Sequence, residues 1–199
     1  MLLARIFLKP FHSFVQFSVR ISRTRTNYWA EFVIDGLLAV AMISTGIILH
    51  PSGWQTIVET LLAGLLIFSF MEYSFHRWPF HNSQSVLAQG HAAHHQNPLG
   101  YDALPFYLPA LIFSALFLLF ALFIPWSYAL LLVGAMTLGY ILYGSSHFII
   151  HHYRFKSRFL RHWAAFHHIH HVHPDKNFGV TSPLWDILLN TLYVSRRNR

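Results

Sequence analysis

Four stretches of the sequence are apolar and long enough to cross a lipid bilayer, and they limit the fold more than any other feature. They comprise residues 30–49, 54–71, 106–124 and 126–146. A helix needs about 20 apolar residues to span the hydrocarbon core. Only 11% of all residues are charged, compared with about a quarter in a typical soluble domain. We therefore expect an all-α integral membrane protein with four transmembrane helices.

Short turns join these stretches into two helical hairpins. Residues 50–53 (His-Pro-Ser-Gly) separate the first pair, and Pro125 separates the second. Lysine and arginine occur before the first stretch, between the second and third, and after the fourth, but at neither hairpin tip. Positively charged loops remain on the cytoplasmic side. We therefore expect a multi-pass protein of the bacterial inner membrane or endoplasmic reticulum, with both termini and residues 72–105 in the cytoplasm.

The N-terminal segment 1–29 is basic and contains no acidic residue. Such a composition also occurs in transit peptides, but a basic amphipathic segment on the membrane surface is the simpler interpretation. Residues 30–199 then form one membrane domain. The net charge of +7, with histidine counted as neutral, favours an anionic membrane surface as partner, and we expect no nucleic acid.

Histidine is the unusual residue of this chain: there are 16, against seven acidic residues and no cysteine. A metal ion would therefore be held mainly by imidazole. Four histidine clusters lie on the predicted cytoplasmic side, and these are the candidate metal ligands: His76 and His81; His91, His94 and His95; His147 and His151; His167, His170 and His171.

The spacing within these clusters indicates helices. Two clusters have i, i+3, i+4 spacing, which places three imidazoles on one helical face, and we expect each triplet to point at one volume. His147 and His151 form an i, i+4 pair at the end of the fourth stretch. Pro79 should break the helix between His76 and His81, so that these two histidines flank a bend.

Four membrane crossings return all four clusters to the same face of the membrane. Ten imidazoles are enough for two metal ions with about five ligands each. Imidazole suits iron, zinc, copper or nickel, and spacing does not choose among them. Calcium and magnesium prefer oxygen ligands, and the Glu-x-x-His pattern of ferritin-like bundles is absent from the sequence.

Each cluster taken alone also has a simpler interpretation as an interfacial pair or an adventitious metal-binding tract. Four histidines lack partners at ligand spacing and are expected to be ordinary surface residues: His12, His50, His162 and His173. Five residues are candidate hydrogen-bond partners of the ligand imidazoles, or else turn, cap or exposed residues: Asp102, His152, His168, Asn177 and Asp186.

The histidine clusters, together with residues 72–81 (EYSFHRWPFH), 90–95 (GHAAHH) and 177–186 (NFGVTSPLWD), resemble the fatty acid hydroxylase / sterol desaturase superfamily. The HxxxxH form of the first cluster is most similar to fatty acid 2-hydroxylases. The resemblance covers residues 29–186. Two positions depart from it: Gly144 stands near the place where relatives often have Asp, and Asn190 where related desaturases carry Gly.

The resemblance implies four transmembrane helices under a cytosolic metal-bearing cap, within residues 30–199. It implies two metal ions, iron in the active enzyme with zinc as an alternative in a purified form, that use O2 to hydroxylate the acyl chain of a fatty acid or lipid at C2. The ten clustered histidines would be the ligands, with no further catalytic residue. A separate electron-transfer protein, cytochrome b5-like or a ferredoxin, would supply electrons.

Three other interpretations fit the same residues, one of them a catalytically inactive relative with a structural metal. A sterol desaturase or carotenoid hydroxylase would use the same scaffold on a different lipid. A metal transporter or metal-storing membrane protein would bind metal without catalysis, but transporters place their ligands near the middle of the bilayer. The histidine clusters here lie at the ends of the apolar stretches, which favours the enzyme.

Overall fold

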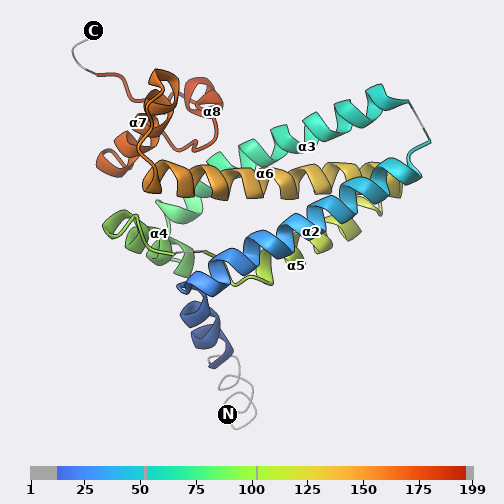
Figure 1. The fold of residues 1–199 in the computed structure, drawn as a ribbon, viewed down its shortest axis with the longest axis horizontal. Coiled ribbons are helices and arrows are strands. Elements are labelled where there is room, and N and C mark those ends of the chain that lie inside the picture. Colours follow the sequence, from blue (N-terminus) through green and yellow to red (C-terminus); the bar gives the residue numbers. More distant parts are fainter. Residues whose placement is uncertain (1–12, 52, 102, 196–199) are drawn as a thin grey trace.

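In the computed structural model, which describes residues 13–195 except 52 and 102, all regular elements are helices (Figure 1). Three long helices run side by side: α2 (Arg25–Leu49), α3 (Trp54–Phe75) and α6 (Trp126–His152). The shorter helix α5 (Leu108–Phe120) lies along α2 and α6. At one end of this bundle lie α4 (Val86–Gln96), α7 (Arg158–Val172) and α8 (Leu184–Leu188).

Three helices of the described chain are long and apolar enough to cross a membrane: Arg25–Leu49, Trp54–Phe80 and Trp126–His152. They correspond to the first, second and fourth predicted stretches. At the end that bears α4 and α7 they continue beyond the apolar residues. Helix α6, for example, extends to His152 and so carries His147 and His151 on its last turns.

The third predicted stretch forms a shorter helix than expected. Helix α5 has 13 residues, which gives a length of about 20 Å, compared with about 30 Å for the hydrocarbon core. Pro109 lies in its first turn, and residues 121–124 form turns before Pro125. The residue before a proline disfavours the helical conformation, which is one reason why this apolar run ends early as a helix.

The hydrophobic core lies where the four helices meet, with α6 at the centre. Met42, Phe68, Phe113 and Met136 come from α2, α3, α5 and α6 and form one cluster. Small residues bring the helices close together, as is common in membrane bundles. A Cβ on Gly64 would lie only 2.4 Å from the backbone oxygen of Leu132. This packing holds the ends of α3 and α6 at a fixed separation.

The helix of α3 does not break at Pro79. It continues as the π-helical turn η1 (His76–Phe80), which contains Pro79, and the chain leaves the helix at His81. The prediction of a break at the proline was therefore wrong by two residues. Proline has no N–H to donate, and π-turns commonly replace the regular α-helical pattern near functional sites.

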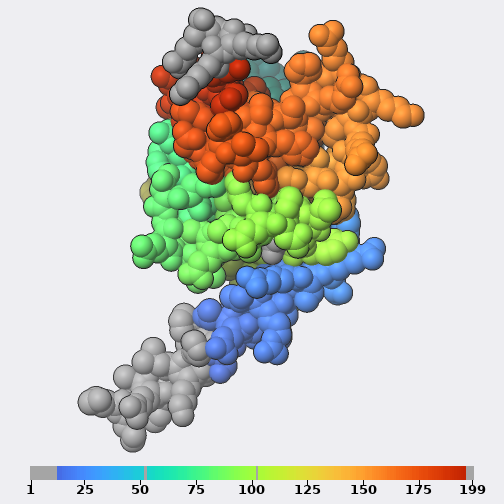
Figure 2. All heavy atoms as spheres, turned by 90° about the vertical axis from the view of Figure 1, so that its left-hand side faces the viewer, coloured from blue at the N-terminus to red at the C-terminus, as the bar shows by residue number. Residues whose placement is uncertain are grey.

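Figure 2 shows the end of the bundle that bears α4, α7 and α8, with α4 lying between α7 on one side and the described part of the N-terminal segment on the other. Two residues in the C-terminal part have positive φ, Asn177 at 54° and Asn190 at 59°. Asparagine tolerates this left-handed conformation better than most residues. The geometry explains why Asn190 can stand where related desaturases carry glycine.

The N-terminal segment packs on residues 103–107. Residues 13–22 are helical, and the hydroxyl groups of Ser18 and Tyr107 lie 2.7 Å apart. The Asn27 side chain donates to the Leu104 carbonyl oxygen and accepts from the Phe106 N–H. Residues 1–12 lie outside the described chain, and the placement of segment 1–29 on the membrane surface stays a prediction.

Candidate metal centre

The structure gathers the ten clustered histidines at one end of the bundle, in two groups of five. Within each group every residue offers one ligand atom, and these atoms lie within 4.8 Å of one another. Site A consists of His76, His81, His91, His95 and His170. Site B consists of His94, His147, His151, His167 and His171.

The two triplets do not each point at one volume, and that prediction was wrong. On α4, His91 and His95 belong to site A while His94 belongs to site B. On α7, the i and i+4 residues contribute to site B and the i+3 residue, His170, to site A. The reason is rotational: each residue turns a helix by about 100°, so i+3 and i+4 lie on opposite sides of i. Helices α4 and α7 therefore each serve both sites.

The imidazoles are spaced as ligands of one ion would be. In site A, the Nε2 atom of His91 lies 3.0 Å from that of His76, 2.9 Å from that of His81 and 3.0 Å from that of His95. With metal–nitrogen bonds of about 2.1 Å, two ligands at right angles would be about 3.0 Å apart, and tetrahedral ligands about 3.4 Å. The nitrogens are therefore close enough together to bind one ion.

Site B has the same compact arrangement. The Nε2 atom of His167 lies 3.0 Å from that of His151 and 3.1 Å from that of His171. The Nε2 atoms of His94 and His147 are buried and have no hydrogen-bond partner in the described structure. An unsatisfied buried polar atom costs about 1–3 kcal/mol. A metal ion would satisfy both atoms, so the residues present fit such an ion.

Two imidazoles of site A are fixed by backbone carbonyl groups. The Nδ1 atom of His76 lies 2.5 Å from the Phe178 oxygen, and that of His170 lies 2.7 Å from the Lys176 oxygen. A carbonyl oxygen only accepts, so each Nδ1 must carry the proton. Their Nε2 atoms therefore present lone pairs to the centre of site A.

Burial keeps the clustered imidazoles neutral. It is the main reason why the pKa of His94 and of His170 is lowered to about 3 and that of His81 to about 4, and neighbouring histidines lower them further. The pKa of His91 is lowered in the same way. Neutral imidazole is the form that binds metal. At neutral pH these side chains are therefore ready to act as ligands.

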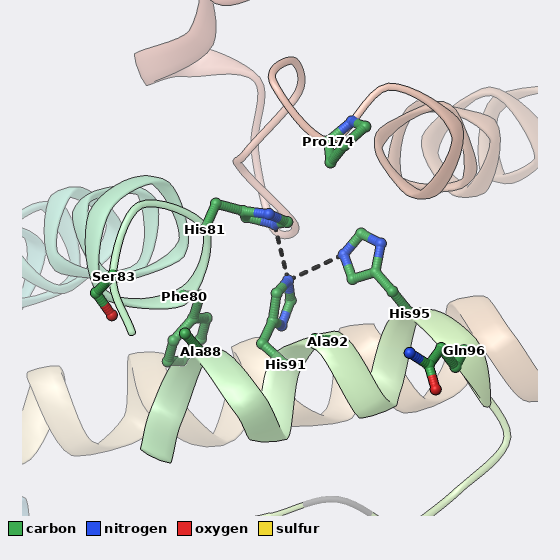
Figure 3. Close-up of a pocket in the computed structure, with 9 residues that line it drawn as sticks. All are labelled: Phe80, His81, Ser83, Ala88, His91, Ala92, His95, Gln96 and Pro174. Atoms are coloured by element: carbon green, nitrogen blue, oxygen red, sulfur yellow. Dashed lines mark hydrogen bonds between the residues drawn. The ribbon is translucent and has the colours of Figure 1, made fainter. Parts of the chain in front are cut away.

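Site A borders a cavity of about 390 Å³ that opens between η1, α4 and the segment after α7 (Figure 3). His81, His91 and His95 line it together with Phe80 and Gln96. No imidazole of site B is among its lining residues. The cavity is large enough for several water molecules or a small reactant.

Of the other predicted residues, the four that the structure describes form no hydrogen bond to the imidazoles of the two sites. His152 and His168 are exposed, and His152 stacks on Phe148. Asn177 bonds to the backbone of Phe166 and Tyr193, and Asp186 bonds to backbone N–H groups and to Thr191. Asp102 lies outside the described residues.

Sequence reasoning missed Glu72. Its carboxylate is buried and accepts hydrogen bonds from the Val180 N–H and from both the N–H and hydroxyl of Thr181. The available signal was its place four residues before His76, an acid at the end of an apolar stretch. Gly144, the other departure noted above, packs against Phe32, whose ring a Cβ would approach to 2.9 Å.

The helices and the histidines define a class: an all-helical membrane protein in which two adjacent polyhistidine groups are suited to holding metal ions. The sequence model of the fatty acid hydroxylase family matches residues 61–191, more than half of the chain. The chain belongs to this family, and the resemblance seen in its motifs is confirmed.

Individual relatives agree with this assignment. The chain is 32% identical over 188 residues to a dihydroceramide fatty acyl 2-hydroxylase of Arabidopsis thaliana, covering 88% of this chain and 78% of the relative. It is 33% identical over 147 residues to a fatty acid 2-hydroxylase of Rattus norvegicus, covering 68% of this chain and 40% of that protein.

A solved structure shows the same fold. The hydroxylase domain of scs7p superposes with a TM-score of 0.74 at 22% identity, covering 88% of this chain and 69% of that one. The chain spans 58% of a second Arabidopsis thaliana 2-hydroxylase and 40% of the rat protein, so it corresponds to only part of several relatives.

Proposed function

We propose that this protein is a membrane-bound lipid hydroxylase that inserts one oxygen atom into an acyl chain, at the carbon next to the carbonyl group. The observation that carries the proposal is the pair of five-imidazole sites, in a chain of the fatty acid hydroxylase family. Relatives named as 2-hydroxylases of fatty acids and dihydroceramide support the substrate class and position.

Sites A and B would each hold one metal ion, for which iron is the expected ion in the active protein. Bound iron would supply the redox chemistry that O2 and a saturated carbon chain lack. The overall change is R–CH2–CO–X + O2 + 2e⁻ + 2H⁺ → R–CHOH–CO–X + H2O. The two electrons must come from a separate donor, for which a cytochrome b5-like protein or a ferredoxin has suitable chemistry.

The contribution of the chain is to hold and shield the sites. His76 and His170 keep a proton on Nδ1 by donating it to backbone carbonyl groups, which leaves Nε2 free to bind metal. Burial of His94, His167 and His170 excludes bulk water from the centre. The ten ligand imidazoles are neutral, so the site carries no compensating negative charge of its own.

We propose four membrane crossings, with the sites on the cytoplasmic face. The third crossing would consist of α5 and the non-helical residues that flank it, which is acceptable where the backbone is covered by protein. The basic residues beside the sites support this orientation. An acyl chain could then reach the sites from the adjacent leaflet.

Metal analysis of the purified protein, combined with mass spectrometry of lipids from cells that express it, tests the proposal. We expect about two iron atoms per chain and a gain of 16 mass units on acyl chains. His94→Ala should abolish the gain, whereas His162→Ala, which removes an exposed histidine of α7, should not. A purified chain that binds no metal, or unchanged acyl chains in cells that express the unmodified protein, would refute the proposal.

A further inference from the structure

Residues 177–181 lie in a loop between α7 and α8, and two buried carboxylates bind the amide groups of residues 178–181. Asp186 accepts from the N–H groups of Phe178 and Gly179, at 2.9 and 2.8 Å. Glu72 on α3 accepts from the N–H groups of Val180 and Thr181, at 2.6 and 2.9 Å. Four consecutive amide groups are thus held by two side chains that are distant from each other in the sequence.

The arrangement is specific and tightly packed. Asp186 is fully buried, and its Oδ1 also accepts from the Thr191 hydroxyl. A Cβ on Gly179 would lie 2.1 Å from the Ser182 oxygen and 3.1 Å from Asp186 Oδ2. Among the described residues, the ion pair found is between Lys176 and Asp175, so neither Glu72 nor Asp186 is neutralised by a cation there. Amide and hydroxyl dipoles hold both carboxyl groups.

One peptide group joins Asp186 to site A. The Gly179 N–H that donates to Asp186 and the Phe178 C=O that accepts from His76 Nδ1 belong to the same peptide unit. A hydrogen bond at the N–H end of a peptide strengthens the acceptor at its C=O end. The carboxylate therefore acts on the imidazole through the peptide, in the order Asp186, Phe178–Gly179 peptide, His76.

Site B has no comparable support from this loop. The carbonyl groups of Phe178 and Lys176 bond to His76 and His170, both in site A. In site B, the Nδ1 atom of His167 is buried and has no hydrogen-bond partner in the described structure. The two sites therefore differ in how their imidazoles are oriented.

We propose that Asp186 is a positioning residue for site A, acting through the Phe178–Gly179 peptide to orient His76 and make its Nε2 a stronger metal ligand, with Glu72 holding the rest of the loop. This rests on the proposed role of the two groups as metal sites. Direct carboxylate–histidine–metal arrangements work in the same way. Here a peptide group lies between the carboxylate and the ring.

Asp186→Asn tests this with little change in shape. The amide nitrogen of Asn cannot accept from the second N–H, so the bond to the Gly179 amide or to the Phe178 amide is lost. We expect the metal affinity of site A to fall about 10- to 100-fold and that of site B to be unchanged. Asp175→Asn, at an exposed position four residues after His171, is the matched control and should change neither.

The measurements are Co²⁺ titration of the full chain in detergent against a competing chelator, and NMR of the ¹⁵N-labelled histidines. The Nδ1–H signal of His76 reports the hydrogen bond to Phe178, and we expect it to move towards a weaker bond in Asp186→Asn. A residue that only stabilised the fold would weaken both sites alike and leave this signal in place, and that result would overturn the proposal.

Two further variants keep the test decisive if Asp186→Asn does not fold. Thr191→Val retains the carboxylate but removes one of its donors. The carboxylate then accepts more strongly from the Gly179 amide, so the His76 signal should move slightly towards a stronger bond. Glu72→Gln should loosen the loop without breaking the bond between Asp186 and Gly179, with Glu59→Gln on the same helix as control.

The His76 signal is also readable without metal, so a chain that bound no metal would refute the proposed function while still revealing the effect of Asp186. An unchanged His76 signal in Thr191→Val, or in Asp186→Asn where that variant folds, would refute the positioning role.

Discussion

Replacing Gly64 with alanine should separate α3 from α6. The added Cβ would lie 2.4 Å from the Leu132 oxygen and 2.7 Å from the Ala135 Cβ. A carbon and a carbonyl oxygen normally approach to about 3.3 Å, so the helices must move apart by about 1 Å. Overpacking of this kind costs about 1–3 kcal/mol, and we expect the free energy of unfolding to fall by that amount.

The same displacement should affect the metal sites. Helix α3 leads directly into His76, and α6 carries His147. A misplacement of about 1 Å can reduce a rate by about 10²-fold, so the hydroxylation rate should fall by up to about that factor. Thermal unfolding in a single detergent, followed by fluorescence, and acyl-chain hydroxylation measure the two effects.

Gly36→Ala is the control for this experiment, because its Cβ would meet no atom within 4 Å. That variant should be neutral or more stable by up to about 1 kcal/mol, since alanine favours the helix. If Gly64→Ala unfolded at the same temperature as the unmodified protein, or if Gly36→Ala lost as much stability, the close-packing argument would be refuted.

Three further predictions concern the sites and the membrane topology. The double variant His91→Ala/His95→Ala should keep one site at full metal affinity and weaken the other, whereas His91→Ala/His94→Ala should weaken both, because the first pair belongs to one site and the second to both; equal effects on the two sites in both variants would contradict the division. The metal-free protein should lose stability as the pH falls from 6.5 towards 4. Burial lowers the pKa of His81 to about 4 in the folded state, so in this pH range the unfolded chain binds a proton that the folded chain does not. Urea unfolding at several pH values measures this, and no loss of stability below pH 6.5 would contradict it. Single cysteines at Ser83 and Leu122, in a chain without native cysteine, should react with impermeant reagents from opposite sides of the membrane; labelling from the same side would contradict four crossings.

The long helices could be predicted at the ends where proline and glycine mark them. Helices α3 and α6 begin where expected, at Trp54 and Trp126, and α2 ends at Leu49. Their other ends extend beyond the apolar residues, over residues 25–29 in α2, 72–75 in α3 and 147–152 in α6, because polar residues also continue a helix. The early end of α5 could not be seen, since residues 121–124 are apolar in sequence and yet form turns.

For the site, spacing predicted which imidazoles come together but not how they divide. The division depends on which neighbour each side of α4 and α7 faces, and spacing within one helix does not contain that information. The role of Glu72 was hidden for a similar reason: its partners Val180 and Thr181 lie 108 and 109 residues away. Interactions between distant loop amides and a carboxylate leave no local pattern.

The convergence of the histidines depends on the direction of the chain rather than on the length of each helix. Helix α3 ends at the sites, whereas α6 begins at the opposite end, where the ring of Tyr128 contacts that of His50 at 4.6 Å. Residues 81–125 must therefore travel the whole length of the bundle, although α5 covers only about 20 Å of it (Figure 1). An extended residue spans about twice the length of a helical one, so the non-helical residues around α5 can complete the distance. A shorter third helix thus still returns α6, with His147 and His151, to the same end as His76.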